Sequence, residues 1–183
     1  ITRHLSLSTK KDKALVRVTV HREVDKGVLE QYGKRHDQYR KIDAEVIPMD
    51  LKNLRYKELN LEFPLDISQH FKCYSKNIIV VAGAKDSGKT AFFMDFVKKN
   101  MNRYDVHYFN SEMGPEEMRM RLDMHKGIKI DDWKFHAYER NAYFSDVIKP
   151  DSVNIIDYLE VNRDFSEAGD QIKAIHEKLK KGI

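Results

Sequence analysis

Residues 83–90, which read Gly-Ala-Lys-Asp-Ser-Gly-Lys-Thr, have the types and spacing needed to bind the phosphates of a nucleotide. They fit the pattern G-x-x-x-x-G-K-[ST] of the phosphate-binding P-loop. The two glycines let the backbone bend tightly enough for successive N–H groups to face an anion. Lys89 can reach the β- and γ-phosphates, and the Thr90 hydroxyl can bind Mg²⁺. The predicted nucleotide-binding residues are Gly83, Ala84, Lys85, Asp86, Ser87, Gly88, Lys89, Thr90 and Ala91.

The residues on either side of this loop predict a strand before it and a helix after it. Residues 78–81 are Ile-Ile-Val-Val, a β-branched run typical of a strand that is buried on both faces. Residues 90–97 open a helix, whose N-terminus adds a partial positive charge beside the loop. A chance glycine-rich turn with a surface lysine is the alternative. The strand–loop–helix context favours the P-loop.

Residues 153–160 (Val-Asn-Ile-Ile-Asp-Tyr-Leu-Glu) predict an apolar strand that ends in an acid, as a Walker B element does. Asp157 could hold Mg²⁺ beside Thr90, usually through water. A single Asp after a strand is also a common turn residue, so this interpretation depends on the P-loop upstream. The predicted metal ligands are therefore Thr90 and Asp157.

Composition narrows the class of protein. The chain of 183 residues suffices for one α/β domain and a small appendage. Its single cysteine, Cys73, excludes an internal disulfide, so a reducing cytoplasm is the expected compartment. No apolar run is long enough to span a bilayer and no secretory signal pattern opens the chain. The eight histidines show no zinc-binding spacing.

The net charge of +4 is unevenly distributed along the chain. Residues 1–42 carry eleven Lys or Arg and five acids, a net charge of +6, which leaves −2 for the remainder. This asymmetry favours an anionic partner at the N-terminal end. A merely solvated basic face is the alternative.

Residues 9–26 can be interpreted in two ways. Val16, Val18 and Val20 alternate with polar residues as in a strand, but Val16, Val20 and Val24 also fall at helical spacing, and Gly27 suits a helix end. We favour a helix, with Ser8 as its N-cap. Residues 28–32 and 38–42 then predict a β-hairpin with a basic tip.

A helix followed by a basic hairpin resembles the second half of a winged helix-turn-helix domain. The resemblance implies a recognition helix over residues 9–22 and a wing at the hairpin. It implies DNA contacts by Lys10, Lys11, Lys13, Arg17, Lys34, Arg35 and Arg40. A winged helix used for protein contacts remains the alternative. The predicted division is a winged-helix-like segment (1–42), a linker that packs on the core (43–64) and the core itself (65–183).

Other elements of the core are predicted from periodicity and from turn residues. They are a short helix over 65–71, a strand over 106–109, a helix from Pro115 that is closed by Gly127, a strand over 133–138, a helical turn over 145–148 and an amphipathic helix over 165–181.

Three segments together resemble the RecA-fold ATPase domain of DnaB-type replicative helicases and their phage relatives. They are the P-loop, Phe109-Asn110-Ser111-Glu112-Met113 and Ile156-Asp157-Tyr158-Leu159-Glu160. The resemblance covers residues 77–183 and implies an α/β core with a mostly parallel sheet. It also implies ATP and Mg²⁺ as ligands, DNA as a partner and assembly into a homo-oligomeric ring.

The resemblance also assigns the general base. Many P-loop ATPases have a glutamate directly after the Walker B aspartate, but Tyr158 stands there. The DnaB-like pattern places this acid at Glu112, which would orient and deprotonate the attacking water, with Lys89 as the other catalytic residue. An acid placed favourably before a helix is the alternative for Glu112. Glu160 is a weaker candidate.

Two departures from the family pattern qualify the expected activity. Gly182-Ile183 stand where the family begins another core strand, and the sensor residue, the DNA-facing loops and the arginine finger would lie beyond it. The winged-helix-like segment is not the usual partner of this ATPase. We therefore expect ATP binding with slow turnover.

The predicted function is that of a helicase-like ATPase of DNA replication or recombination, from a phage or mobile element. Three rival functions stay open. They are a nucleotide-gated DNA-binding regulator or loader, a P-loop small-molecule kinase, and a scaffold with a degenerate nucleotide site. The Asp-Tyr-Leu sequence at residues 157–159, where the predicted strand ends, argues against the small-molecule kinase.

Overall fold

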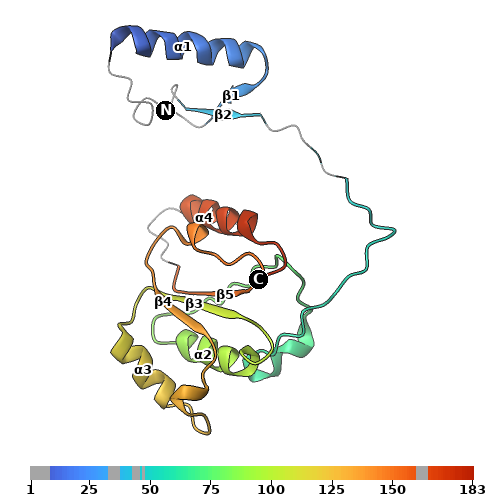
Figure 1. Ribbon diagram of the computed structural model, residues 1–183, viewed down its shortest axis with the longest axis vertical. Coiled ribbons are helices and arrows are strands. Elements are labelled where there is room, and N and C mark those ends of the chain that lie inside the picture. The colour runs from blue at the N-terminus through green and yellow to red at the C-terminus, as the bar shows by residue number, and fades with distance from the viewer. Residues whose placement is uncertain (1–8, 33–37, 43–45, 47, 160–164) are drawn as a thin grey trace. The chain divides into compact units, whose positions relative to one another are not determined.

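The computed structural model describes residues 9–32, 38–42, 46, 48–159 and 165–183. The chain divides into two compact units, residues 1–54 and residues 55–183 (Figure 1). The boundary between them falls within the predicted linker over residues 43–64.

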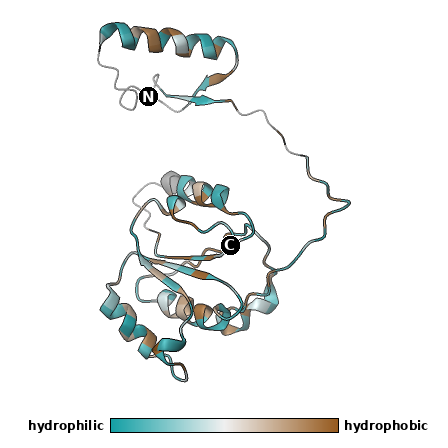
Figure 2. Cartoon of the chain, in the orientation of Figure 1, coloured by the Kyte–Doolittle hydropathy of each residue, from teal (hydrophilic) through white to brown (hydrophobic). Residues whose placement is uncertain are grey.

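The first unit contains helix α1 (Lys10–Asp25), so the helical interpretation of this segment is confirmed. Thr9 is the N-cap, and its hydroxyl and the Asp12 carboxylate form a capping box. The predicted cap, Ser8, lies outside the described residues. Gly27, with φ of +69°, follows the helix end in the left-handed conformation that glycine adopts without strain. Figure 2 shows that α1 is largely hydrophilic, and none of its residues is buried.

Strands β1 (Leu29–Gln31) and β2 (Tyr39–Lys41) pair antiparallel and confirm the predicted hairpin. The hairpin tip, residues 33–37, lies outside the described part of the chain. The Val28 N–H donates to the Glu23 carbonyl, and the Ile42 N–H donates to the Val28 carbonyl. These backbone bonds join the end of α1 to the start of the hairpin.

The second unit is built on a parallel sheet with the strand order β4-β3-β5. These strands are β3 (Val106–Asn110), β4 (His136–Glu139) and β5 (Val153–Asp157). The helices are α2 (Lys89–Asn100), α3 (Pro115–Asp123) and α4 (Phe165–Lys178). The parallel pairing of β3 with both neighbours confirms an α/β unit.

Helices cover both faces of this sheet. Figure 1 shows α2 and α3 on one face and α4 on the other. Tyr108 and Ile155 pack into the core beneath α2 and α3, whereas Phe109 packs with Ile175 of α4 and with Leu179, which follows that helix. The alternation follows from the period of two along a strand, which sends neighbouring side chains to opposite faces.

Short 3₁₀ helices occupy Pro64–His70, Ile130–Asp132 and Phe144–Asp146. The first confirms a helical segment near the predicted position, although Leu65 and Asp66 within it have positive φ. The third predicted strand begins only at His136, because Trp133 still closes the second of these helices through its N–H bond to Ile130.

The predicted strand before the P-loop is not found. Residues 78–81 pair with no described strand, and Ile79 and Val80 are 37% and 70% exposed. The physical reason is that an apolar groove, and not a hydrogen-bonded neighbour, lies between this segment and β5. The loop is therefore approached by an unpaired segment.

The buried side-chain amide of Asn100 joins residues 55–64 to α2. The Asn100 side chain donates to the carbonyls of Glu62 and Phe96, and it accepts from the Glu62 N–H at 2.9 Å. Asn100 is fully buried, so these bonds replace all contact of its amide with water. Phe63, next along the chain, packs on Phe96 with ring centroids 4.8 Å apart.

Asn100→Ala should therefore destabilise the second unit by about 2–3 kcal/mol, because it leaves the partly buried N–H and carbonyl of Glu62 without partners. Urea unfolding followed by circular dichroism measures the change. Asn102→Ala is the matched control: its side chain is exposed, so the free energy of unfolding should change by less than about 0.5 kcal/mol. Equal effects of the two substitutions would contradict a clamping role for Asn100.

Candidate nucleotide-binding site

The loop that precedes α2 makes a compact turn. The Ser87 N–H donates to the Ala84 carbonyl at 3.3 Å, and Asp86 and Gly88 have φ of +60° and +88°. Glycine adopts such a φ without cost, which explains its place at position 88. At Gly83 a Cβ would lie 2.5 Å from the Ser87 hydroxyl, which would then have to turn away. The loop is exposed to solvent along residues 82–88.

The N-terminus of α2 has the properties of an anion site. Its N-cap is Gly88, no side chain accepts a hydrogen bond from the first turn, and that turn contains no acid. The first N–H groups of a helix have no partner within the helix, and the helix dipole adds positive charge there. A phosphate group therefore fits this end of α2.

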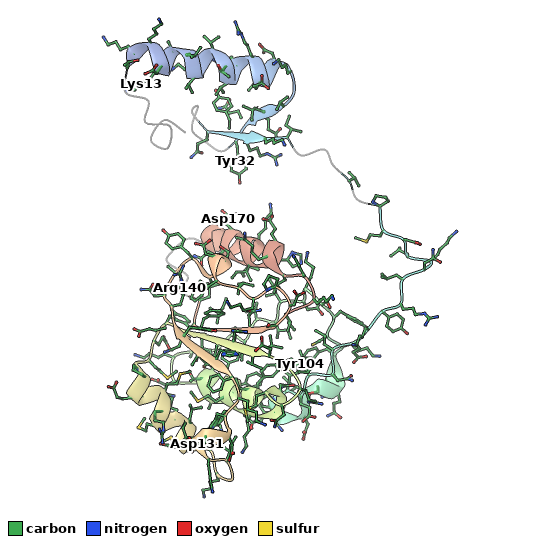
Figure 3. All side chains as sticks on the ribbon, in the orientation of Figure 1. Lys13, Tyr32, Tyr104, Asp131, Arg140 and Asp170 are labelled. Atoms are coloured by element: carbon green, nitrogen blue, oxygen red, sulfur yellow. The ribbon has the colours of Figure 1, made fainter. Side chains whose placement is uncertain are left out.

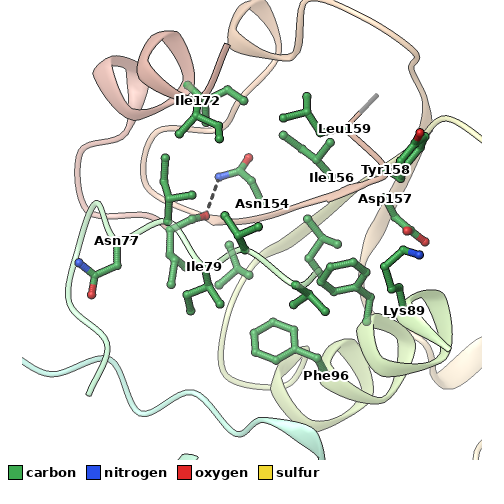
Figure 4. A pocket seen from close by; sticks show the side chains of 18 of the residues that line it. Asn77, Ile79, Lys89, Phe96, Asn154, Ile156, Asp157, Tyr158, Leu159 and Ile172 are labelled. Carbon is green, nitrogen blue, oxygen red and sulfur yellow. Dashed lines mark hydrogen bonds between the residues drawn. The ribbon is translucent and has the colours of Figure 1, made fainter. Parts of the chain in front are cut away.

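Lys89 places its ammonium group over the loop. Its Nζ donates to the carbonyls of Gly83 and Ala84, at 3.1 and 2.8 Å. Figure 4 shows the side chain extending from α2 toward the carboxylate of Asp157. The structure thus brings together two predicted site residues that are 68 positions apart in the sequence. Thr90 follows in the first turn of α2.

Asp157 ends β5 and is 2% exposed. The Tyr108 hydroxyl donates to its Oδ2 at 2.5 Å. Burial, followed by the nearby Asp157 charge, raises the pKa of Tyr108 far above its ordinary value. Tyr108 therefore remains a hydrogen-bond donor at all physiological pH values and orients the carboxylate. The bond uses only one carboxylate oxygen, which leaves the other able to hold a cation or its water.

The segments that follow β3 and β5 are joined at the carboxyl edge of the sheet. Asn110 and Asp157 lie opposite each other in the register of β3 and β5. The Ser111 N–H donates to the Asp157 carbonyl at 2.9 Å, and the Ser111 hydroxyl bonds to both the N–H and the carbonyl of Tyr158. The peptide bond between Asp157 and Tyr158 is cis.

Glu112 is held at this same edge by the Asn110 side chain. The buried amide oxygen of Asn110 accepts from the N–H groups of Glu112 and Met113, at 3.2 and 3.1 Å, and its amide nitrogen donates to the Met113 carbonyl. This Asx turn fixes the backbone of Glu112, whose side chain is exposed. The two predicted acids thus follow neighbouring parallel strands. Glu160, the weaker candidate, lies outside the described residues.

Sequence reasoning missed Tyr108, Asn110 and Ser111, although all three position predicted site residues. Asn110 offered a signal, because Asn directly after an apolar strand is a common turn former. Tyr108 offered none, since its bond joins residues 49 positions apart.

A second polar cluster lies at the amino end of the strands. Asp105 Oδ2 is 2.8 Å from His107 Nε2 and accepts from the Ser152 hydroxyl, and Asp105 Oδ1 is 3.3 Å from His136 Nε2. The other ring nitrogen of His107 is 3.1 Å from the Tyr138 hydroxyl. Both nitrogens of this buried histidine therefore have protein partners.

This cluster predicts a small pH dependence of stability. The hydrogen bond with His107, followed by that from Ser152, lowers the pKa of Asp105 from its ordinary 3.8. A lowered carboxyl pKa stabilises the fold above pH 3.8, and this contribution is lost as pH falls through the lowered value. Because the Asp105 side chain is 57% exposed, solvent screening keeps the effect below about 1 kcal/mol.

Asp105→Asn should accordingly lower the free energy of unfolding at pH 6, and the difference from wild type should shrink as the pH falls below 3.8. Urea unfolding across this range measures it. Asp131→Asn changes an exposed acid of the second 3₁₀ helix and serves as the control. A difference that grows toward low pH would reverse the assigned sign.

The residues predicted to contact DNA are only partly described. Lys10, Lys11, Lys13 and Arg17 are exposed on α1, and Figure 3 labels Lys13 among them. Arg40 instead forms an ion pair with Glu30 of the neighbouring strand and lies over the Tyr32 ring, 5.9 Å from its centroid. Lys34 and Arg35 lie outside the described residues.

No known protein-family model matches this chain, and comparison with curated proteins finds no match. Among the described helices, none combines the length and the apolar character that a membrane crossing requires.

Proposed function

We propose that the second unit is a Mg-ATP-dependent ATPase with a RecA-like fold, related to DnaB-type helicases. The observation that carries the proposal is the approach of Lys89, the first residue of a helix whose N-terminus has no side-chain cap, to Asp157 at the carboxyl end of a parallel strand. In open α/β sheets, ligands bind at this edge of the sheet.

Each residue at this edge has a definite role in the proposed reaction. The backbone N–H groups of residues 84–90 bind the phosphates, and Lys89 leaves its loop carbonyls to bind the γ-phosphate. Thr90 and Asp157 would hold Mg²⁺, which neutralises the charge that develops on the phosphates. Glu112 orients a water molecule for in-line attack and accepts its proton.

DNA is the proposed partner of the first unit. The charge of +6 on residues 1–42 and the four exposed cations of α1 support phosphate contacts. In this proposal the protein works in the cytoplasm as a ring, in DNA replication or recombination. A nucleotide-gated regulator or loader is the second candidate, because the chain carries a separate helix–hairpin unit ahead of the unit with the candidate nucleotide site, and such a unit could bind DNA without unwinding.

Measuring ATPase rate with and without single-stranded DNA on the intact protein tests the proposal. We expect tight ATP binding, slow turnover of the isolated chain, and stimulation by DNA. Strand separation on a forked substrate then distinguishes a helicase from a regulator or loader. Failure to bind ATP in the presence of Mg²⁺ would refute the proposal, and vigorous DNA-independent turnover by a monomer would refute the ring.

A further inference from the structure

The polar cluster at the amino end of the strands has the donor set of a metal site. Asp105 directly precedes β3, His107 lies on β3, and His136 is the first residue of β4. One donor atom from each of these residues lies within 4.8 Å of the other two. His107 and His136 are partners in the parallel register of β3 and β4, which places their side chains next to each other.

The two imidazole rings present the same nitrogen to one carboxylate. Asp105 Oδ2 is 2.8 Å from His107 Nε2, and Asp105 Oδ1 is 3.3 Å from His136 Nε2. The ligands of a tetrahedral Zn²⁺ ion, with bonds of about 2.0–2.1 Å, lie about 3.3–3.4 Å apart. The separations in the cluster, from 2.8 Å to at most 4.8 Å, bracket this value.

Closing the cluster around an ion requires only movements of exposed side chains. The His107 and His136 rings are stacked, with centroids 4.7 Å apart and an angle of 18° between their planes. Their Nε2 atoms therefore converge on one ion when the His136 ring tilts. The side chains of His136 and Asp105 are 59% and 57% exposed, so both have room to turn, whereas the buried His107 stays in place.

Neighbouring hydroxyl groups orient two of the three ligands. The Nδ1 of His107 is 3.1 Å from the Tyr138 hydroxyl, and the Ser152 hydroxyl donates to Asp105 Oδ2 at 2.8 Å. Metal-binding histidines and carboxylates are held by outer partners in this way. Burial explains why His107 has partners. It does not explain why His136, which water can reach, also faces the Asp105 carboxylate.

We propose that Asp105, His107 and His136 bind one divalent metal ion of the Zn²⁺ type, at the end of the sheet opposite the candidate nucleotide site. Imidazole nitrogen favours such an ion over Mg²⁺, which prefers oxygen ligands. On binding, His107 carries its ring proton on Nδ1, with the Tyr138 hydroxyl as the acceptor, and its Nε2 becomes a metal ligand. Three protein ligands leave the fourth tetrahedral position to water.

The ion links the start of β3 to the start of β4. Spacing along the chain does not reveal the site, because its two histidines come from different strands. This inference does not depend on nucleotide binding. The pH dependence of stability described above applies to the metal-free protein.

Calorimetric titration of the intact, untagged protein with Zn²⁺ tests the proposal, in excess Mg²⁺ and without nucleotide. We expect one Zn²⁺ ion per chain, bound about a hundredfold more weakly by His136→Ala, because even an outer partner contributes about tenfold to a hundredfold. His176→Ala removes an exposed histidine of α4 and is the matched control, with an affinity within about twofold of wild type. Absence of Zn²⁺ binding, or equal affinities of wild type and His136→Ala, would overturn the proposal.

NMR of the histidine rings provides a second test, which needs no substitution of the buried His107. One equivalent of Zn²⁺ should shift the ring signals of His107 and His136 and leave those of His70 and His176 in place. Shifts confined to other histidines would overturn the proposal. Tyr138→Phe should weaken Zn²⁺ binding by about tenfold without changing the number of sites, because it removes only the partner of His107 Nδ1.

Discussion

Lys89→Ala should lower the affinity for Mg-ATP by about a hundredfold, the largest binding effect that we expect from one substitution. The ammonium group contributes charge-assisted hydrogen bonds to the terminal phosphates, each worth about 1.5–3 kcal/mol, and alanine provides no replacement. Titration with a fluorescent ATP analogue measures the change. The fold should persist, because the Nζ bonds only to exposed loop carbonyls.

Lys85→Ala is the matched control, since Lys85 is a cation of the same exposed loop. It removes the same charge without the contact to Gly83 and Ala84, and should weaken binding by less than threefold, about 0.6 kcal/mol. Equal losses in the two variants would show that general loop charge, and not the P-loop lysine, binds the nucleotide. Unchanged affinity in Lys89→Ala would argue for a scaffold with a degenerate site.

Glu112→Gln should reduce ATP turnover by between about a hundredfold and ten-thousandfold, the range typical of a lost general base. Affinity for ATP should change little, because the Glu112 side chain is exposed and glutamine keeps the backbone bonds that Asn110 accepts. Single-turnover hydrolysis by the intact protein with DNA, compared with equilibrium ATP binding, separates the two effects.

Glu116→Gln supplies the comparison, because Glu116 is an exposed acid in the first turn of α3, four residues further along the chain. Its turnover should stay within about twofold of wild type. If Glu112→Gln retains normal turnover while Lys89→Ala loses ATP binding, the proposed nucleotide site is supported and a residue other than Glu112 acts as the general base. If both substitutions at 112 and 116 slow turnover equally, the effect belongs to the N-terminus of α3 and not to a base.

The local elements of this protein follow from its sequence. The spacing of Val16, Val20 and Val24 predicts α1, and Gly27 predicts its end, because helix periodicity and termination depend on nearby residues. The apolar runs that became β3 and β5 were predicted for the same reason. The P-loop motif, too, is a local pattern of glycines, lysine and threonine in front of a helix.

Pairing between distant segments was decided only by the tertiary structure. The β-branched run before the P-loop has every local property of a strand, yet it pairs with no described segment, since pairing needs a neighbour that local spacing does not specify. The same holds for the Tyr108 hydroxyl on Asp157 and for the Ser111 bridge to Tyr158. The sequence alone thus determined which residues are candidates for phosphate binding. The packing of helices on both faces of a parallel sheet determined which of these residues lie together, because it brings separate strand ends to one edge.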